Sequence, residues 1–141
     1  MDTDTEVLDG IVHEPTQTEG RGVDLTVAEV YEVTAPGHVD FGGGELEAAD
    51  LSPHDSARRH ADDDYEWWTL DAGQYLLEYN ESIAVEEATI TIQTRDELLA
   101  RGASHPTLRL TSLDRVPLSV GGAGLKLKEN ARVSTVVDVD R

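Results

Sequence analysis

An arginine followed by two carboxylates is the group of residues in this sequence best suited to chemistry. Arg95, Asp96 and Glu97 stand where segment 88–92, whose apolar residues alternate as in a strand, passes into a short helix-like segment. The first backbone N–H groups of a helix are free and carry partial positive charge, so an arginine beside them can seat a phosphate. The sequence therefore predicts an anion-binding site centred on Arg95.

Asp96 and Glu97 alter the chemistry of that site. Carboxylates in the first turn of a helix are themselves attracted to its N-terminus, and they would face an incoming polyphosphate at short range. Like charges repel at such distances unless a cation lies between them. A polyphosphate bound beside Arg95 would therefore need a cation that offsets the two acidic side chains.

The elements that position Arg95 have recognisable start and stop signals. Thr94 lies three residues before Glu97, which is the spacing of a capping box at a helix N-terminus. Leu98 and Leu99 supply an apolar face, and Gly102 can end the helix in a left-handed conformation. We therefore expect a strand that delivers its chain directly into one short helix.

Most of the remaining chain has the pattern of short strands. Segments 22–27, 74–79 and 132–137 alternate or are rich in β-branched residues, and turn signals such as Pro-Gly at 36–37 and the glycines at 42–44 separate such segments. Many short strands with frequent turns and one short helix predict an all-β fold, a distorted β-barrel or jelly roll.

Composition divides the chain into a body, two ends and one insertion. Residues 1–20 are polar and acidic and predict an N-terminal arm, whereas 21–137 form the barrel domain. Residues 42–66 are strongly charged and predict an acidic loop inserted in that domain, and 138–141 form a C-terminal tail. The histidines and aspartates of this loop could be interpreted as metal ligands, but a solvated loop is the better interpretation because no flanking structure would fix their geometry.

The overall charge excludes several classes of partner. The chain has 29 acidic and 11 basic residues, a formal charge of −18, no cysteine and only two lysines, Lys126 and Lys128. Such a surface is typical of a protein adapted to a salty cytosol, where salt screens self-repulsion. We expect no nucleic-acid partner, because no basic stripe could neutralise a phosphate backbone, and no membrane span, because no long apolar run exists. These features predict a cytoplasmic protein.

Two motifs resemble one known family. Arg95, Leu98 and Gly102 after an alternating strand, with Gly22-Val23-Asp24-Leu25-Thr26-Val27 upstream, resemble the archaeal type of the dCTP deaminase and dUTP diphosphatase superfamily. In that family the segment that corresponds to 95–98 usually reads Arg-Ser-Ser-Leu, and its arginine and serines hold the phosphates. This chain has Arg-Asp-Glu-Leu there, so it resembles a divergent member. The resemblance implies a distorted β-barrel, also called a β-clip, that assembles as a homotrimer with sites at subunit boundaries.

The resemblance also implies roles for individual residues. Asp24 maps to an aspartate that borders the active site, and Arg95, Asp96 and Glu97 map to the substrate-binding segment. The family places a water-activating carboxylate in the interval that corresponds to 107–120. Asp114 is the carboxylate present in that interval, which has neither the glycine nor the aromatic residue of the family motif. Asp24 and Asp114 are therefore the candidate catalytic residues.

Three hypotheses for the function follow. The first is an enzyme of deoxyribonucleotide metabolism that acts on dUTP or dCTP, with Mg²⁺ bridging Asp96, Glu97 and the triphosphate. The second is a catalytically degenerate relative that kept the trimeric barrel and serves as a nucleotide-binding or partner protein. The third is a structural interaction domain in which Arg95 merely pairs with Asp96 or Glu97 on the helix surface.

Overall fold

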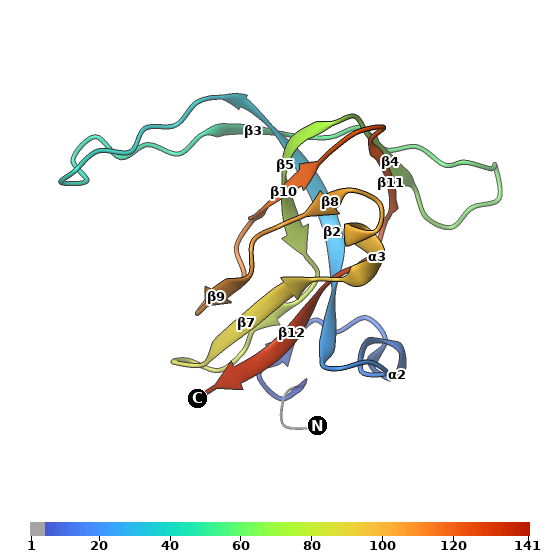
Figure 1. Ribbon diagram of the computed structural model, residues 1–141, viewed down its shortest axis with the longest axis horizontal. Helices are drawn as coiled ribbons and strands as arrows, with labels where there is room; N and C mark the ends of the chain where they lie inside the picture. Colours follow the sequence, from blue (N-terminus) through green and yellow to red (C-terminus); the bar gives the residue numbers. More distant parts are fainter. Residues whose placement is uncertain (1–4) are drawn as a thin grey trace.

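A curled antiparallel sheet of eight strands surrounds the core in the computed structural model, which describes residues 5–141 (Figure 1). Its strands are β2 (Val23–Ala35), β3 (Asp50–Pro53), β5 (Gly73–Tyr79), β7 (Thr89–Thr94), β8 (Ala103–Ser104), β9 (Leu108–Leu110), β10 (Val116–Val120) and β12 (Arg132–Asp140). They are ordered β8-β10-β5-β2-β12-β7-β9, and β3 pairs with the far end of β2. The predicted all-β fold of many short strands is confirmed.

Two short ladders and two short helices complete the fold. The ladders are β1 (Leu8–Asp9) with β6 (Ser82–Ile83) and β4 (Trp67–Leu70) with β11 (Leu125–Lys128), and the helices are α2 (Glu14–Gln17) and α3 (Asp96–Leu99). The sequence predicted one helix, and α2 was missed because four residues are too few to show a helical period. No helix within residues 5–141 has the length and apolar content needed to cross a bilayer.

The N-terminal segment packs onto the sheet. Val7 is fully buried, Leu8 is 6% exposed and Gln17 is 1% exposed, so the part of the predicted arm between residues 5 and 20 contributes to the core. The first four residues of that arm lie outside the described residues. Buried Gln17 gave no hydrophobic signal in the sequence, because its burial depends on hydrogen bonds made to distant residues.

The long strand β2 is the centre of the sheet. It pairs with β12 through its first half and with β5 and β3 through its second half. Val23, Leu25 and Val27 face the core as their alternation predicts, but Asp24 and Thr26 on the other face are buried as well. The N-terminal segment covers that face, because Gln17 donates to the Asp24 carbonyl at 2.8 Å. The polar pair Asp24 and Thr26 on this face of β2 is therefore enclosed.

The start of α3 differs from the predicted capping box. Arg95, in extended backbone geometry, is the N-cap residue and makes no side-chain cap bond. Thr94 continues the alternation of β7 and faces the core, where its hydroxyl donates to the His105 carbonyl and accepts from the His105 N–H, both at 2.9 Å. Thr94 is therefore buried in the sheet and does not cap α3 as the sequence predicted. Gly102 adopts the predicted left-handed conformation, with a φ of 83°.

A buried chain of polar groups links the segment after β8 to β12 and β5. His105 donates from Nδ1 to the Pro106 carbonyl at 2.7 Å, so its Nε2 accepts from the Ser134 hydroxyl, also at 2.7 Å. Ser134 can then accept from Tyr79. A protonated imidazole would place a second N–H against the Ser134 hydroxyl and break this order. Burial accordingly lowers the pKa of His105 below its ordinary value of 6.5.

We expect the free energy of unfolding to fall as the pH drops below about 6.5. In that range histidine in the unfolded chain takes a proton that folded His105 resists, so the stabilisation is complete above pH 6.5 and is lost as the pH falls through the folded-state pKa. Urea denaturation between pH 5 and 7.5 measures this slope. His105→Gln cannot titrate and should lose less stability over the same range, whereas equal slopes for the two proteins would contradict the assignment.

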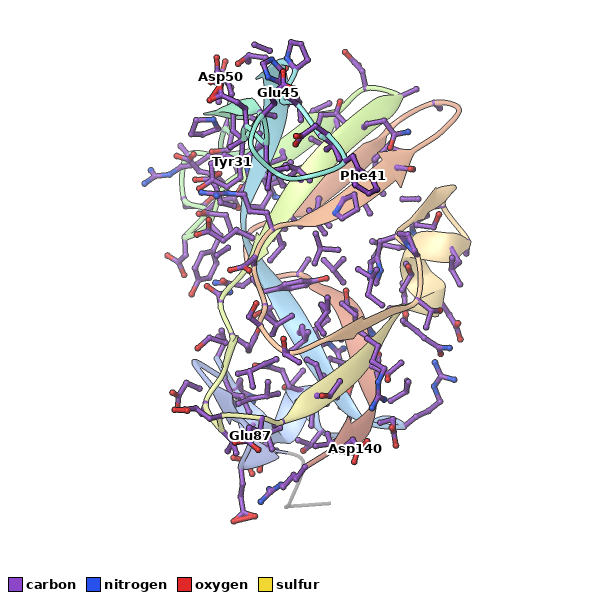
Figure 2. All side chains as sticks on the ribbon, turned by 90° about the vertical axis from the view of Figure 1, so that its left-hand side faces the viewer. Tyr31, Phe41, Glu45, Asp50, Glu87 and Asp140 are labelled. Atoms are coloured by element: carbon purple, nitrogen blue, oxygen red, sulfur yellow. The ribbon has the colours of Figure 1, made fainter. Side chains whose placement is uncertain are left out.

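The predicted acidic insertion forms two projections from the body. The chain leaving β2 and returning as β3 makes a hairpin arm, residues 36–49, and the segment before β4 forms a second loop on another side of the molecule (Figure 1). Figure 2 looks toward the end of the arm, where Phe41 and Glu45 lie. Arg59 of the second loop and Lys128 of β11 both stack on the ring of Trp67, the first residue of β4, with charge-to-centroid distances of 4.9 and 5.5 Å. The two projections leave the core intact.

Candidate functional site

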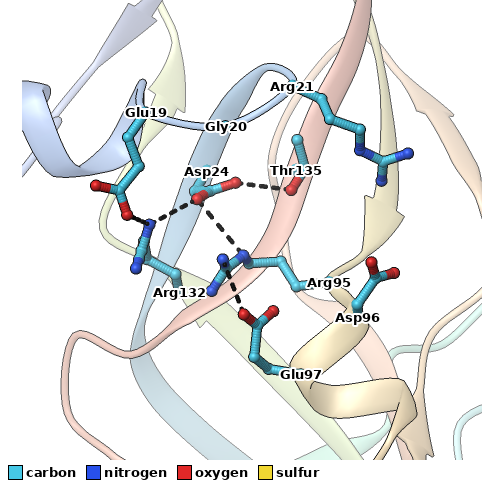
Figure 3. Close-up of a pocket in the computed structure, with 9 residues that line it drawn as sticks. All are labelled: Glu19, Gly20, Arg21, Asp24, Arg95, Asp96, Glu97, Arg132 and Thr135. Atoms are coloured by element: carbon cyan, nitrogen blue, oxygen red, sulfur yellow. Dashed lines mark hydrogen bonds and ion pairs between the residues drawn. The ribbon is translucent and has the colours of Figure 1, made fainter.

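A cavity of about 280 Å³ opens where β2, β12 and the start of α3 converge (Figure 3). It lies at the β7-to-α3 junction that the sequence identified. The residues that line it carry three guanidinium groups and four carboxylates, and they are Glu19, Gly20, Arg21, Asp24, Arg95, Asp96, Glu97, Arg132 and Thr135. The cavity is therefore a strongly polar pocket in which opposite charges are interleaved.

Asp24 is at the centre of the pocket. Its carboxylate is 4% exposed and receives Arg95 Nε at 3.5 Å and Arg132 Nη1 at 3.1 Å on the same oxygen, Oδ2. Its other oxygen, Oδ1, accepts a hydrogen bond from the Thr135 hydroxyl at 2.7 Å. Two cations and one hydroxyl thus hold a buried carboxylate in one orientation (Figure 3).

The pairing of β2 with β12 creates this arrangement. Thr135 lies directly opposite Asp24 in the ladder, and Arg132 lies opposite Thr26 at the start of the shared segment. Gly22 permits the close approach, because a Cβ at that position would lie 2.0 Å from the Val136 carbonyl oxygen. Any other residue at position 22 would push the two strands apart and separate Asp24 from its partners.

The two arginines that hold Asp24 also contact surface carboxylates. Arg132 Nη1 lies 3.0 Å from Glu19 Oε2 and 3.0 Å from the Thr16 carbonyl oxygen. Arg95 Nη2 lies 3.4 Å from Glu97 Oε2, and the Glu97 side chain is 59% exposed. Exposed ion pairs contribute at most about 1 kcal/mol. An incoming phosphate can therefore displace Glu97 from Arg95 at little cost while Asp24 stays in place.

Arg21 and Asp96 are the charged residues of the pocket whose side chains have no hydrogen-bond or ion-pair partner within residues 5–141. Arg21 is an exposed guanidinium at the rim, and Asp96 is an exposed carboxylate at the first position of α3. A free cation can meet an anionic ligand, and a free carboxylate can meet a cation carried by that ligand. The pocket therefore offers one free guanidinium at its rim and one free carboxylate at the start of α3.

The structure brings four of the five predicted site residues into one pocket. Asp24, Arg95, Asp96 and Glu97 all line it, whereas Asp114 does not. Asp114 lies between β9 and β10, accepts a hydrogen bond from the Ser112 hydroxyl at 2.9 Å and borders a separate cavity. Within one chain, Asp114 therefore has no access to a ligand held beside Arg95.

Sequence reasoning missed Arg132, Thr135, Arg21 and Glu19 as pocket residues. The basic segment before the last strand was a usable signal, because Arg132 is the first residue of β12. Its pairing with Asp24 depends on the β2–β12 register, which local patterns do not encode. Arg21 and Glu19 flank Gly20 in the turn that leads into β2, and nothing in their spacing indicated that this turn borders the pocket.

A buried hydrogen-bond network supports the pocket from behind. Glu81, which is 2% exposed, accepts from the Thr26 N–H at 2.9 Å, the Thr26 hydroxyl at 2.6 Å and Gln17 Nε2 at 2.8 Å. Burial raises the pKa of Glu81, and the three donors act in the opposite direction. Because Gln17 also donates to the Asp24 carbonyl, this network ties the N-terminal segment to the strand that carries Asp24.

Comparisons with known proteins identify relatives of this chain. No protein-family model matches the chain. It is 28% identical over 133 residues to the probable deoxyuridine 5'-triphosphate nucleotidohydrolase of Methanosarcina acetivorans and 26% identical over 133 residues to that of Methanosarcina mazei. Each alignment covers 90% of this chain and 74% of the relative.

A solved structure shares the fold. The crystal structure of 2'-deoxycytidine 5'-triphosphate deaminase from Agrobacterium tumefaciens superposes with a TM-score of 0.58 at 10% sequence identity. The superposition covers 92% of this chain and 42% of the deaminase chain. At that level of identity the likeness establishes a common fold, and the pocket residues must carry any statement about chemistry.

Proposed function

Because this chain is a divergent member of the dCTP deaminase and dUTP diphosphatase superfamily, we propose that it acts on a deoxypyrimidine nucleoside triphosphate in deoxyribonucleotide metabolism. The observation that carries the proposal is the pocket in which Asp24 holds Arg95 and Arg132 side by side. The substrate we favour is dUTP, since both sequence relatives are named for its hydrolysis. The alternative substrate is dCTP, for which the structural relative is named.

The proposed reaction is hydrolysis between the α- and β-phosphates. Water adds to phosphorus, the bridging P–O bond breaks, and the products are dUMP and pyrophosphate. Arg95, Arg132 and Arg21 bind phosphate oxygens, and the first two are held in place by Asp24. A cavity of about 280 Å³ lies just below the roughly 300–1,000 Å³ of pockets that enclose whole ligands. We therefore assign the phosphates to this pocket and the base to the surface beyond it.

In this proposal Mg²⁺ binds together with the phosphates of the substrate. Within residues 5–141 no group of three or more histidine, cysteine or acidic side chains is placed to hold a metal ion. Mg²⁺ commonly keeps several waters and binds through one or two carboxylates together with substrate phosphates. Unpaired Asp96 fits the protein's share of such a site, with Glu97 as a second carboxylate once it leaves Arg95. The ion would offset the charge of the triphosphate among four carboxylates.

Asp114 and the oligomer belong to the same proposal. Asp114 is exposed and lies outside the Arg95 pocket, so it can activate water only in the pocket of another copy. We assign it that role in a homotrimer with sites at subunit boundaries, which is the arrangement that the resemblance implies. A single chain would then bind the phosphates without completing the catalytic site.

The test of the proposed function is direct. Purified protein in high salt with Mg²⁺ is given dUTP and dCTP separately, and release of pyrophosphate and of ammonia is followed. We expect pyrophosphate from dUTP. Ammonia from dCTP would instead assign deamination, and tight dUTP binding without turnover would favour the degenerate nucleotide-binding relative. Absence of both binding and turnover for each nucleotide would contradict the proposal.

Asp96→Asn should raise the Mg²⁺ concentration needed for half-maximal turnover by about 10-fold, because the loss of one charged ligand contact amounts to about 1.4 kcal/mol. Turnover at saturating Mg²⁺ should change much less. Titration of Mg²⁺ at fixed dUTP measures both quantities. Asp138→Asn, a substitution of an exposed aspartate outside the pocket, is the matched control and should leave the titration unchanged. An unchanged Mg²⁺ requirement in Asp96→Asn would remove Asp96 from the cation site.

A further inference from the structure

The tip of the hairpin arm exposes apolar side chains that nothing within residues 5–141 covers. Phe41 is fully exposed, Val39 is 90% exposed and Leu46 is 64% exposed. Phe41 lies at the end of the projecting hairpin (Figure 2). Single exposed apolar residues are common, but three within eight residues of one hairpin are typical of a contact surface. An exposed phenylalanine at such a tip has the form of an interface anchor.

The tip is held in one conformation. Asp40 Oδ2 accepts hydrogen bonds from the N–H groups of Gly43 and Glu45, both at 3.2 Å. Below it, His38 and Glu47 exchange two backbone hydrogen bonds of 2.9 and 3.0 Å. Gly37 allows this pairing, because a Cβ there would lie 2.4 Å from the Glu47 carbonyl oxygen. A preformed tip loses little conformational freedom on binding, which favours a specific contact.

The charge of the arm restricts what it can contact. Segment 36–49 contains Asp40, Glu45 and Glu47 and has no lysine or arginine. In a chain with a formal charge of −18, most of the surface would repel it. The complementary surface must therefore combine an apolar hollow with positive charge.

A groove on this same chain has that combination. A cavity of about 420 Å³ lies over the connection between β9 and β10, and its lining includes Leu108, Leu110 and Val116. Arg109 and Arg115 also line it, together with the Asp114 carboxylate. The two arginines form exposed surface pairs with Asp140 at 2.9 Å and with Glu78 at 3.5 Å. We call this cavity, bounded by residues 108–117, the basic groove. Arg109 is 56% exposed and its surface pair with Asp140 can be exchanged for another carboxylate at little cost.

We propose that the arm of one copy of this chain inserts Phe41 into the basic groove of a second copy. The arm leads away from the body, so its tip cannot reach its own groove while β2 and β3 stay paired (Figure 1). Because the two contacting surfaces differ, the contact is head-to-tail and closes into a ring when the rotation between copies permits. Asp114 lines the basic groove and also a neighbouring cavity that Glu78 lines. The side of the Asp114 carboxylate that faces this second cavity therefore stays open when Phe41 fills the groove.

Disulfide cross-linking tests the contact without any nucleotide. The chain has no cysteine, so Gly42→Cys at the tip and Thr111→Cys in the groove supply the sole thiols. A Cβ at Gly42 meets no atom within 4 Å, and Thr111 is exposed. After mild oxidation we expect the double variant to form covalent multimers on a non-reducing gel, with both single variants remaining single chains. A double variant that stays a single chain, or cross-linking by Gly42→Cys alone, would overturn the proposal.

The mass in solution provides a second readout. We expect sedimentation equilibrium to give a multiple of 15.4 kDa for the natural chain and the mass of a single chain for Phe41→Asp. Tyr65→Asp changes an exposed aromatic residue on the other loop and should keep the mass of the natural chain. A natural chain that sediments as 15.4 kDa, or a Phe41→Asp variant of unchanged mass, would overturn the contact. A natural chain of 15.4 kDa would also remove the homotrimer that the proposed function includes, whereas an unchanged mass in Phe41→Asp would overturn the arm contact alone.

Discussion

Replacing Arg95 with alanine is expected to lower kcat/KM for dUTP by about 100-fold. Arg95 is 18% exposed and directs Nη2 toward the open side of the pocket through a weak contact with Glu97, so this guanidinium can bind a phosphate oxygen. A hydrogen bond to a charged group contributes up to about 3 kcal/mol, and a 100-fold change corresponds to about 2.7 kcal/mol. Steady-state pyrophosphate release at saturating Mg²⁺ measures the effect.

Two comparisons make the Arg95 result specific. Arg101→Ala removes an exposed arginine near the same helix that lies outside the pocket, so it should retain the activity of the natural chain. Arg95→Lys keeps the charge but loses the planar pair of donors, and we expect intermediate activity. If Arg95→Ala and Arg101→Ala had equal activity, the guanidinium would have no role in binding phosphate and the pocket would lose its assigned function.

The Arg95 pocket could be predicted in part because its signals are local. The alternation of 88–92 and the acidic pair after Arg95 lie within ten residues, and they correctly place a strand before a short helix. The detail at the junction was wrong, because Thr94 satisfies its hydroxyl in the core against His105 rather than capping α3. At Thr94 the alternation of the strand and the capping-box spacing predict different roles, and the alternation was correct.

The other half of the pocket could not be read from local patterns. Arg132 and Thr135 reach Asp24 only through the β2–β12 register, which joins positions more than 100 residues apart. Gln17 likewise has the sequence signature of a solvated residue, yet it is buried because distant acceptors and donors satisfy its amide. Pairing of distant strands and burial of satisfied polar groups are properties of the assembled fold.

Glu81 shows how strongly the fold depends on such a polar network. Taking this carboxylate out of water costs free energy, which is why its pKa is raised, and the Thr26 and Gln17 donors offset that cost. Asn80 extends the network by donating to the Thr26 hydroxyl at 2.9 Å and to the side chain of Asn130 at 2.8 Å. Glu81 is the side-chain acceptor for the Thr26 N–H, the Thr26 hydroxyl and one N–H of Gln17.

Glu81→Ala is therefore expected to lower the free energy of unfolding by about 3 to 5 kcal/mol, since it removes the acceptor of the Thr26 N–H, the Thr26 hydroxyl and one of the two Gln17 N–H groups. Urea denaturation at pH 7 measures the loss. Glu81→Gln keeps one acceptor oxygen but turns an N–H₂ group toward other donors, so its loss should be smaller than that of alanine and clearly above zero. Glu86→Ala, an exposed glutamate in the turn that follows, should change stability by no more than about 0.5 kcal/mol. Equal effects at positions 81 and 86 would show that the network does not stabilise the fold.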